Sequence, residues 1–169
     1  MSIAASVVKA LTETGLTIAC AETLTGGGIT QALIRVPGSS RVLGYSAVVY
    51  SDRAKTELLG VDPETIRRFG AVSRETALEM AEGVAAAARA DLGLAVTGVA
   101  GPGGGTAEKP VGMVCFALKA EDETITRTVP FGNLGRSEIM DRSVTAALEM
   151  AADYLSHRTE RNEREHPQT

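Results

Sequence analysis

Short apolar segments alternate with longer amphipathic segments along most of this 169-residue chain. The apolar runs at 16–21, 42–50 and 92–97 have the length of buried strands, and 111–120 with 123–129 predicts a hairpin around Glu121 and Asp122. Helices are predicted over 2–14, 25–35, 51–59, a short stretch from Pro63, 73–90 and roughly 135–157. Strands that alternate with helices favour an α/β fold in which helices cover a mixed sheet.

The length is that of one ordinary domain, which we expect to span 1–158. The polar segment 159–169 is predicted to be a disordered tail. A net charge of −4 argues against a broad surface for nucleic acid, and the absence of tryptophan leaves few aromatic platforms for single strands. The expected partner is therefore a small molecule, with a homo-oligomer as an open alternative.

The chain begins without a basic segment followed by an apolar core, and it contains no 18-residue apolar run. Cys20 and Cys115 lie far apart in apolar stretches, so no disulfide framework is indicated. We therefore expect a cytoplasmic protein with no membrane partner. The only histidines, His157 and His166, lie near the polar C-terminus, which argues against a histidine-based triad or zinc site. Neither a metal nor another cofactor is expected.

The first glycine-rich motif, Ala21–Gly28, follows a predicted strand and opens a predicted helix with Thr25 as its N-cap. Backbone N–H groups at such a helix start attract anions such as phosphate. The alternative is a tight strand-to-helix turn with close packing. The motif is neither a dinucleotide-binding fingerprint nor a P-loop.

The second motif, Gly98–Gly112, contains six glycines and Glu108-Lys109-Pro110. So much glycine costs backbone entropy, and it is useful where amide groups must approach a ligand. A flexible connection between strands is the alternative. Both glycine-rich loops follow strands, so we expect them at one edge of the sheet, where ligands of α/β proteins bind.

The third motif joins the turn serines Ser39 and Ser40 to Tyr50 and Lys55. In a chain without a usable histidine, a serine nucleophile would need a lysine base, whose pKa burial or a nearby cation must lower. Taken alone, these residues are more typical of a turn and a surface helix.

Together, AETLTGG (21–27), PGSSRV (37–42), VVYSDRAKTELLGV (48–61), GAVSRETALEMAEG (70–83) and TGVAGPGGGTAEKPVG (97–112) resemble the CinA C-terminal domain family. The resemblance implies a three-layer α/β/α sandwich with a mixed sheet. It also implies hydrolysis of nicotinamide mononucleotide to nicotinate mononucleotide and ammonia, in pyridine nucleotide salvage, by a Ser/Lys pair assisted by a tyrosine. Asp52 departs from the family, which often has asparagine there.

Carried onto this chain, the resemblance implies Ser40 as nucleophile, Lys55 as base and Tyr50 as relay. The predicted substrate-binding residues are Glu22, Thr25, Gly26, Gly27, Ser39, Gly101, Gly103, Gly104 and Arg136. The phosphate is expected first at Thr25-Gly26-Gly27 and second at the 101–105 loop, and Glu22 is expected to favour the cationic pyridinium. A non-catalytic nucleotide-binding or competence- and damage-related interaction domain on the same fold, or another amide or phosphate hydrolase, is the alternative.

Overall fold

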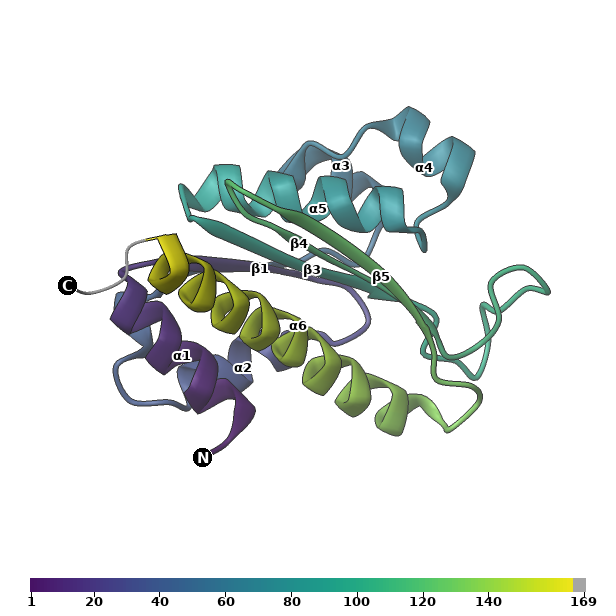
Figure 1. The fold of residues 1–169 in the computed structure, drawn as a ribbon. Helices are drawn as coiled ribbons and strands as arrows, with labels where there is room; N and C mark the ends of the chain where they lie inside the picture. Colours follow the sequence, from purple (N-terminus) through teal and green to yellow (C-terminus); the bar gives the residue numbers. More distant parts are fainter. Residues whose placement is uncertain (166–169) are drawn as a thin grey trace.

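The computed structural model describes residues 1–165 and places one five-stranded sheet between two layers of helices (Figure 1). The strands run β1 (Ile18–Glu22), β2 (Leu43–Val48), β3 (Leu92–Gly98), β4 (Met113–Lys119) and β5 (Thr124–Pro130). Their order across the sheet is β2-β1-β3-β4-β5. The first three strands are parallel, whereas β4 is antiparallel to both of its neighbours, so the predicted mixed sheet is confirmed.

Three helices cover each face of the sheet, which confirms the α/β/α sandwich (Figure 1). One layer contains α1 (Ile3–Thr14), α2 (Gly28–Ile34) and α6 (Arg136–Glu165). The other contains α3 (Asp52–Leu59), α4 (Pro63–Phe69) and α5 (Arg74–Ala88). A short 3₁₀ helix, η1 (Ser39–Arg41), which the sequence reading missed, precedes β2.

The two faces of the central strands carry side chains of different size, because successive strand residues point to opposite faces. Leu94 and Val96 of β3 join the core under α1 and α6, whereas Ala95 joins the core under α5. The small side chains let α5 approach closely, and a Cβ added at Gly93 would lie 1.9 Å from the Ala81 carbonyl oxygen. Gly93 is therefore required by packing.

Several predicted helix ends are confirmed by their caps. Ser51 and Ser73 accept hydrogen bonds from the N–H groups of Ala54 and Thr76, and Gly15 ends α1 in the left-handed conformation. The predicted cap at Thr25 is wrong, because α2 begins only at Gly28 and Gly27 is its cap. The Thr25 hydroxyl instead donates a hydrogen bond to the Glu22 carboxylate.

Helix α6 is longer than predicted and continues to Glu165. Its last turns are held by ion pairs that sequence reasoning did not anticipate: Arg158 and Arg161 lie 3.2 and 2.9 Å from Asp122, in the β4–β5 turn. The segment 159–165, predicted as part of a disordered tail, is therefore helical, and the rest of that tail lies outside the described residues. None of the described helices has both the length and the apolarity needed to cross a membrane.

The strand directions bring the loops after β1, β2, β3 and β5 to one edge of the sheet. The prediction that both glycine-rich loops share an edge is thus confirmed. In Figure 1 the second loop projects from this edge, beyond the strands that precede and follow it.

Candidate active site

A cleft of about 270 Å³ opens at this edge of the sheet. Its lining comes from the loops after β1, β2 and β3, from the α4–α5 loop and from the start of α6. The lining residues are Thr23, Leu24, Tyr50, Asp52, Lys55, Ala71, Val72, Thr97, Gly98, Val99, Ala100, Gly101, Gly103, Gly104 and Arg136. Four separate chain segments that follow strands thus meet at one hollow, the place where α/β folds bind ligands.

Lys55 is the most unusual side chain of the cleft, because it is charged in water and yet only 2% exposed. It sits in the first turn of α3, and its Nζ lies 3.9 Å from an oxygen of Asp52. Among residues 1–165, no group accepts a hydrogen bond from this Nζ. Burial lowers the pKa of Lys55, and the Asp52 carboxylate partly opposes this effect. Lys55 is therefore suited to act as a base.

Three hydroxyl groups line the same cleft. Thr23 Oγ1 donates to the Val49 carbonyl at 3.0 Å, and Thr97 Oγ1 donates to the Ala71 carbonyl at 2.8 Å. Thr97 is fully buried, whereas Thr23 is half-buried and Tyr50 is exposed. Thr23 is thus the aliphatic hydroxyl that a bound ligand can reach.

Arg136 joins two walls of the cleft from the first residue of α6. Its Nη1 donates to the Gly101 carbonyl at 2.8 Å, and its Nη2 donates to the Tyr50 hydroxyl at 2.9 Å. The planar guanidinium fixes both groups at once, which a lysine could not do. Arg136 therefore anchors the second glycine-rich loop and supplies positive charge to the cleft.

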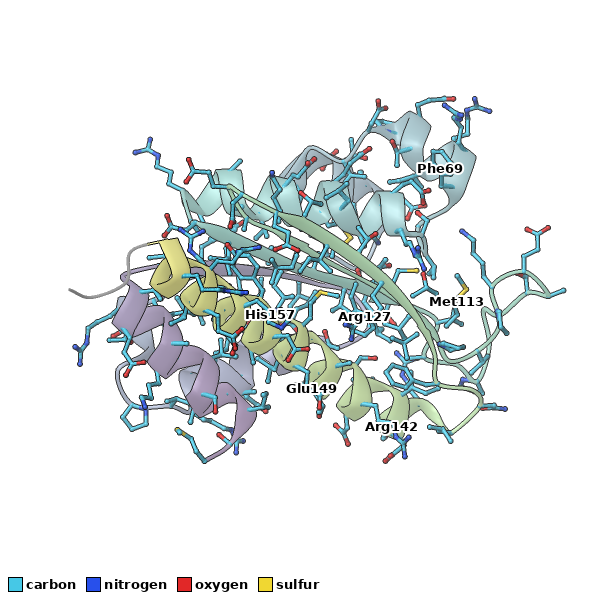
Figure 2. All side chains as sticks on the ribbon, in the orientation of Figure 1. Phe69, Met113, Arg127, Arg142, Glu149 and His157 are labelled. Atoms are coloured by element: carbon cyan, nitrogen blue, oxygen red, sulfur yellow. The ribbon has the colours of Figure 1, made fainter. Side chains whose placement is uncertain are left out.

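The second loop is tied down at its sides, while its glycine amides stay available. Lys109 Nζ donates to the Phe69 carbonyl at the end of α4. Figure 2 labels Phe69 on α4 and Met113 at the start of β4, on the side where this loop projects. Within the described chain, the N–H groups of Gly103 and Gly104 have no acceptor. These two amides can serve an anionic ligand.

The first glycine-rich motif is used differently, because Glu22 occupies it. The carboxylate is completely buried and accepts five hydrogen bonds of 2.6–3.1 Å: from the hydroxyls of Thr25 and Thr30 and from the N–H groups of Gly27, Ile29 and Thr30. The helix start that was predicted to hold a phosphate is therefore filled by the protein's own carboxylate. Neither this start nor Glu22 lines the cleft.

The predicted binding residues Glu22, Thr25, Gly26 and Gly27 thus lie outside the cleft lining. Thr25 is buried and bonded to Glu22, and the Gly26 N–H donates to the Thr23 carbonyl. Both glycines adopt positive φ, 60° for Gly26 and 98° for Gly27. These backbone conformations form a tight turn between β1 and α2, which is the alternative given for this motif in the sequence.

Ser39 and Ser40 are also placed away from the cleft. They form η1 immediately before β2, whereas Tyr50 and Lys55 follow β2. At about 3.3 Å per residue, the six residues of β2 separate its two ends by about 20 Å. The structure therefore places Ser39 and Ser40 outside the cleft that contains Lys55, and Ser39 is buried.

The structure thus brings together six predicted residues: Tyr50, Lys55, Gly101, Gly103, Gly104 and Arg136. It adds Thr23, Asp52 and Thr97, which the sequence reading did not assign to the site. Thr23 carried a usable signal, because it directly follows a strand that leads to the ligand-binding edge. Thr97 resembled an ordinary strand residue.

The one histidine of the described chain, His157, lies far from the cleft. Figure 2 labels His157 on α6, and 21 residues separate it from Arg136, or about 32 Å along a helix. Residue His166 lies outside the described residues. Across residues 1–165, no three His, Cys, Asp or Glu side chains group as metal ligands do.

The sequence matches the family model "CinA C-terminal domain" over residues 1–155. The chain belongs to this family. A CinA-like protein of Kosmotoga olearia is 46% identical over 143 residues, which cover 85% of this chain and 34% of the relative. A protein of Acetivibrio thermocellus named as competence-damage inducible is 48% identical over 147 residues, 87% of this chain and 35% of the relative. The chain thus spans about a third of the length of these relatives.

Solved structures share the whole fold of this CinA-family chain. A competence/damage inducible protein of Agrobacterium tumefaciens matches with a TM-score of 0.88 and 45% identity, covering 91% of this chain and 93% of its own. A CinA superfamily protein of Klebsiella pneumoniae matches with a TM-score of 0.87 and 30% identity, covering 92% of this chain and 96% of its own.

Proposed function

We propose that this CinA-family domain is an amidohydrolase that converts nicotinamide mononucleotide to nicotinate mononucleotide and ammonia. One observation carries the proposal: a buried lysine, whose Nζ has no hydrogen-bond acceptor among residues 1–165, shares a cleft with a reachable hydroxyl, Thr23, and with an arginine, Arg136. A hydroxyl nucleophile with a neutral lysine base can hydrolyse an amide without a histidine.

Thr23 takes the role that was expected of Ser40. Neutral Lys55 accepts the proton of Thr23 Oγ1 as this oxygen attacks the carboxamide carbon. The lysine then gives the proton to the departing nitrogen, so that ammonia leaves and an ester to Thr23 forms. A water molecule, whose proton passes to Lys55, hydrolyses the ester and restores the hydroxyl. The lowered pKa of Lys55 supports this cycle, because a base must be neutral to begin it.

Backbone amides beside Thr23 support the stabilisation of an oxyanion. The Leu24 N–H has no acceptor within residues 1–165, and Leu24 lines the cleft. An oxyanion-hole donor contributes about 3 kcal/mol to the transition state. Leu24 is therefore our candidate for this donor.

The phosphate of the substrate fits the other wall. Gly103 and Gly104 offer free N–H groups, and Arg136 offers a guanidinium beside them. Backbone amides together with an arginine are a common phosphate site. This moves the phosphate from the first glycine-rich motif to the second, which was the second choice of the sequence reading.

The test is release of ammonia by Thr23→Val, which keeps the shape of the side chain and removes the hydroxyl. We expect turnover to fall at least about a thousandfold, and Lys55→Met to have a similar effect. Thr23→Ser keeps the hydroxyl and should remain active. Ser40→Ala is the matched control and should match the wild-type protein.

Wild-type turnover in Thr23→Val would contradict the nucleophile. Loss of turnover in Ser40→Ala, with Thr23→Val active, would restore the serine and require it to come from a second copy. A wild-type protein that binds the nucleotide and releases no ammonia would favour the alternative, a non-catalytic binding domain.

A further inference from the structure

Among the described residues, Asp52 is the one acid that lines the cleft. Its ionisable lining residues are Tyr50, Asp52, Lys55 and Arg136. Glu22, the acid first expected to face a cationic ring, is sealed beneath the loop by its five hydrogen bonds. Any negative charge that a ligand meets from the cleft lining therefore comes from Asp52.

Asp52 is also free to act on a ligand. Its side chain is 62% exposed, and in the described chain its one ion-pair contact is Lys55, at 3.9 Å. Arg136 does not neutralise it, since the guanidinium is directed to Gly101 and Tyr50. Asp52 is the first residue of α3 and directly follows the Ser51 cap.

We propose that Asp52 makes the site selective for substrates whose carboxamide-bearing ring carries a positive charge. The inference rests on the proposed function, because it needs the carboxamide to bind beside Lys55. The ring that carries this carboxamide then binds in the cleft that Asp52 lines together with Lys55. The reaction also requires Lys55 to be neutral, which leaves the charge of Asp52 without its one close partner.

The cleft therefore has two charges of opposite sign that serve different parts of one ligand. Arg136 and the glycine amides face the anionic phosphate, and Asp52 faces the cationic ring. Because the Asp52 side chain is largely exposed, water weakens its effect on the ring, and we expect a preference of about tenfold rather than several orders of magnitude.

The experiment compares nicotinamide mononucleotide with its reduced dihydro form, which keeps the carboxamide, ribose and phosphate while its ring is neutral. Ammonia release and calorimetric binding are measured for the wild-type protein, Asp52→Asn and Glu57→Gln. Glu57 is an acid of the same helix that lies outside the cleft and pairs with Arg53 at 3.6 Å, so it is the matched control.

We expect the wild-type protein and Glu57→Gln to bind the cationic form with a Kd about tenfold lower than that of the reduced form, and this difference to shrink as salt is added. In Asp52→Asn this difference in Kd should disappear, because the cationic form loses affinity while the Kd of the reduced form changes little. The pH profile gives a second readout. Since Asp52 raises the pKa of Lys55, its loss should move the rising limb of activity to lower pH.

An Asp52→Asn protein that keeps the wild-type preference overturns this inference and leaves the proposed function intact. Equal affinity of the wild-type protein for the two forms also overturns this inference and leaves the proposed function intact. Failure of the wild-type protein to bind or hydrolyse either form overturns the proposed function, and this inference with it.

Discussion

The two glycine-rich loops border the same edge of the sheet and use their backbones in opposite ways. In the loop after β1, the N–H groups of Gly27, Ile29 and Thr30 bind the carboxylate of Glu22. In the loop after β3, the N–H groups of Gly103 and Gly104 have no acceptor among the described residues. In the first loop the amides of the glycine end are paired inside the protein and only Thr23 and Leu24 line the cleft, whereas the second loop forms a wall of the cleft.

The difference shows that glycine content alone does not indicate a ligand site. What decides is whether the polar groups of the loop are already paired inside the protein. The side chains that hold the two loops also differ. Glu22, which holds the first loop, is completely buried, whereas Arg136, which holds the second loop through Gly101, lines the cleft.

The largest expected effect on stability comes from a substitution of Glu22. Glu22→Gln keeps the size of the side chain but places an amide NH₂ among groups that are themselves donors. We expect the free energy of unfolding in urea to fall by about 3 kcal/mol, because buried donors lose their acceptor. Glu13→Gln, on the exposed surface of α1, should change it by less than about 0.5 kcal/mol. A fully stable Glu22→Gln protein would remove the distinction between the loops.

A substitution of Arg136 should affect substrate binding more than stability. Arg136→Met removes the charge and both hydrogen bonds, so KM for the mononucleotide should rise about tenfold or more, while stability changes by less than about 1 kcal/mol. Arg142→Met is the control, since Arg142 lies on the same helix and pairs with Glu138. An unchanged KM in Arg136→Met would mean that the second loop does not bind the phosphate.

The smallest expected effects come from alanine substitutions at Gly27 and Gly104. Gly27 and Gly104 both adopt positive φ, 98° and 82°, and no atom lies closer than 3.6 Å to an added Cβ at either residue. Changing either to alanine should therefore cost about 1 kcal/mol of stability through backbone strain. Only Gly104→Ala should also raise KM, by about threefold. A rise of KM in Gly27→Ala instead would return the phosphate to the first loop.

Much of the fold could be predicted from local patterns. The serine caps at Ser51 and Ser73 and the glycine that ends α1 act on their own neighbours in sequence, so their effects are readable without tertiary contacts. The alternation of strands and helices indicated the sheet, and the chain direction of parallel strands placed both glycine-rich loops at one edge.

The candidate site was predictable in part. Tyr50 and Lys55 share one strand end and one helix start, so their proximity follows from a short stretch of chain. Ser40 lies only 15 residues from Lys55, yet β2 runs between them and separates them by its full length. Nearness in sequence was misleading here because an extended strand carries the chain across the molecule.

The sequence by itself determined the α/β class, most helix ends and the edge of the sheet at which both glycine-rich loops lie, because these depend on periodicity, caps and strand direction. Only the tertiary structure decided that Glu22 fills the first loop, that Thr23 rather than Ser40 shares the cleft of Lys55, and that Arg136 reaches Gly101 from 35 residues away. The physical reason is that the pairing of polar groups is settled in space: a free amide and a satisfied one have the same residue name, and only their partners distinguish them.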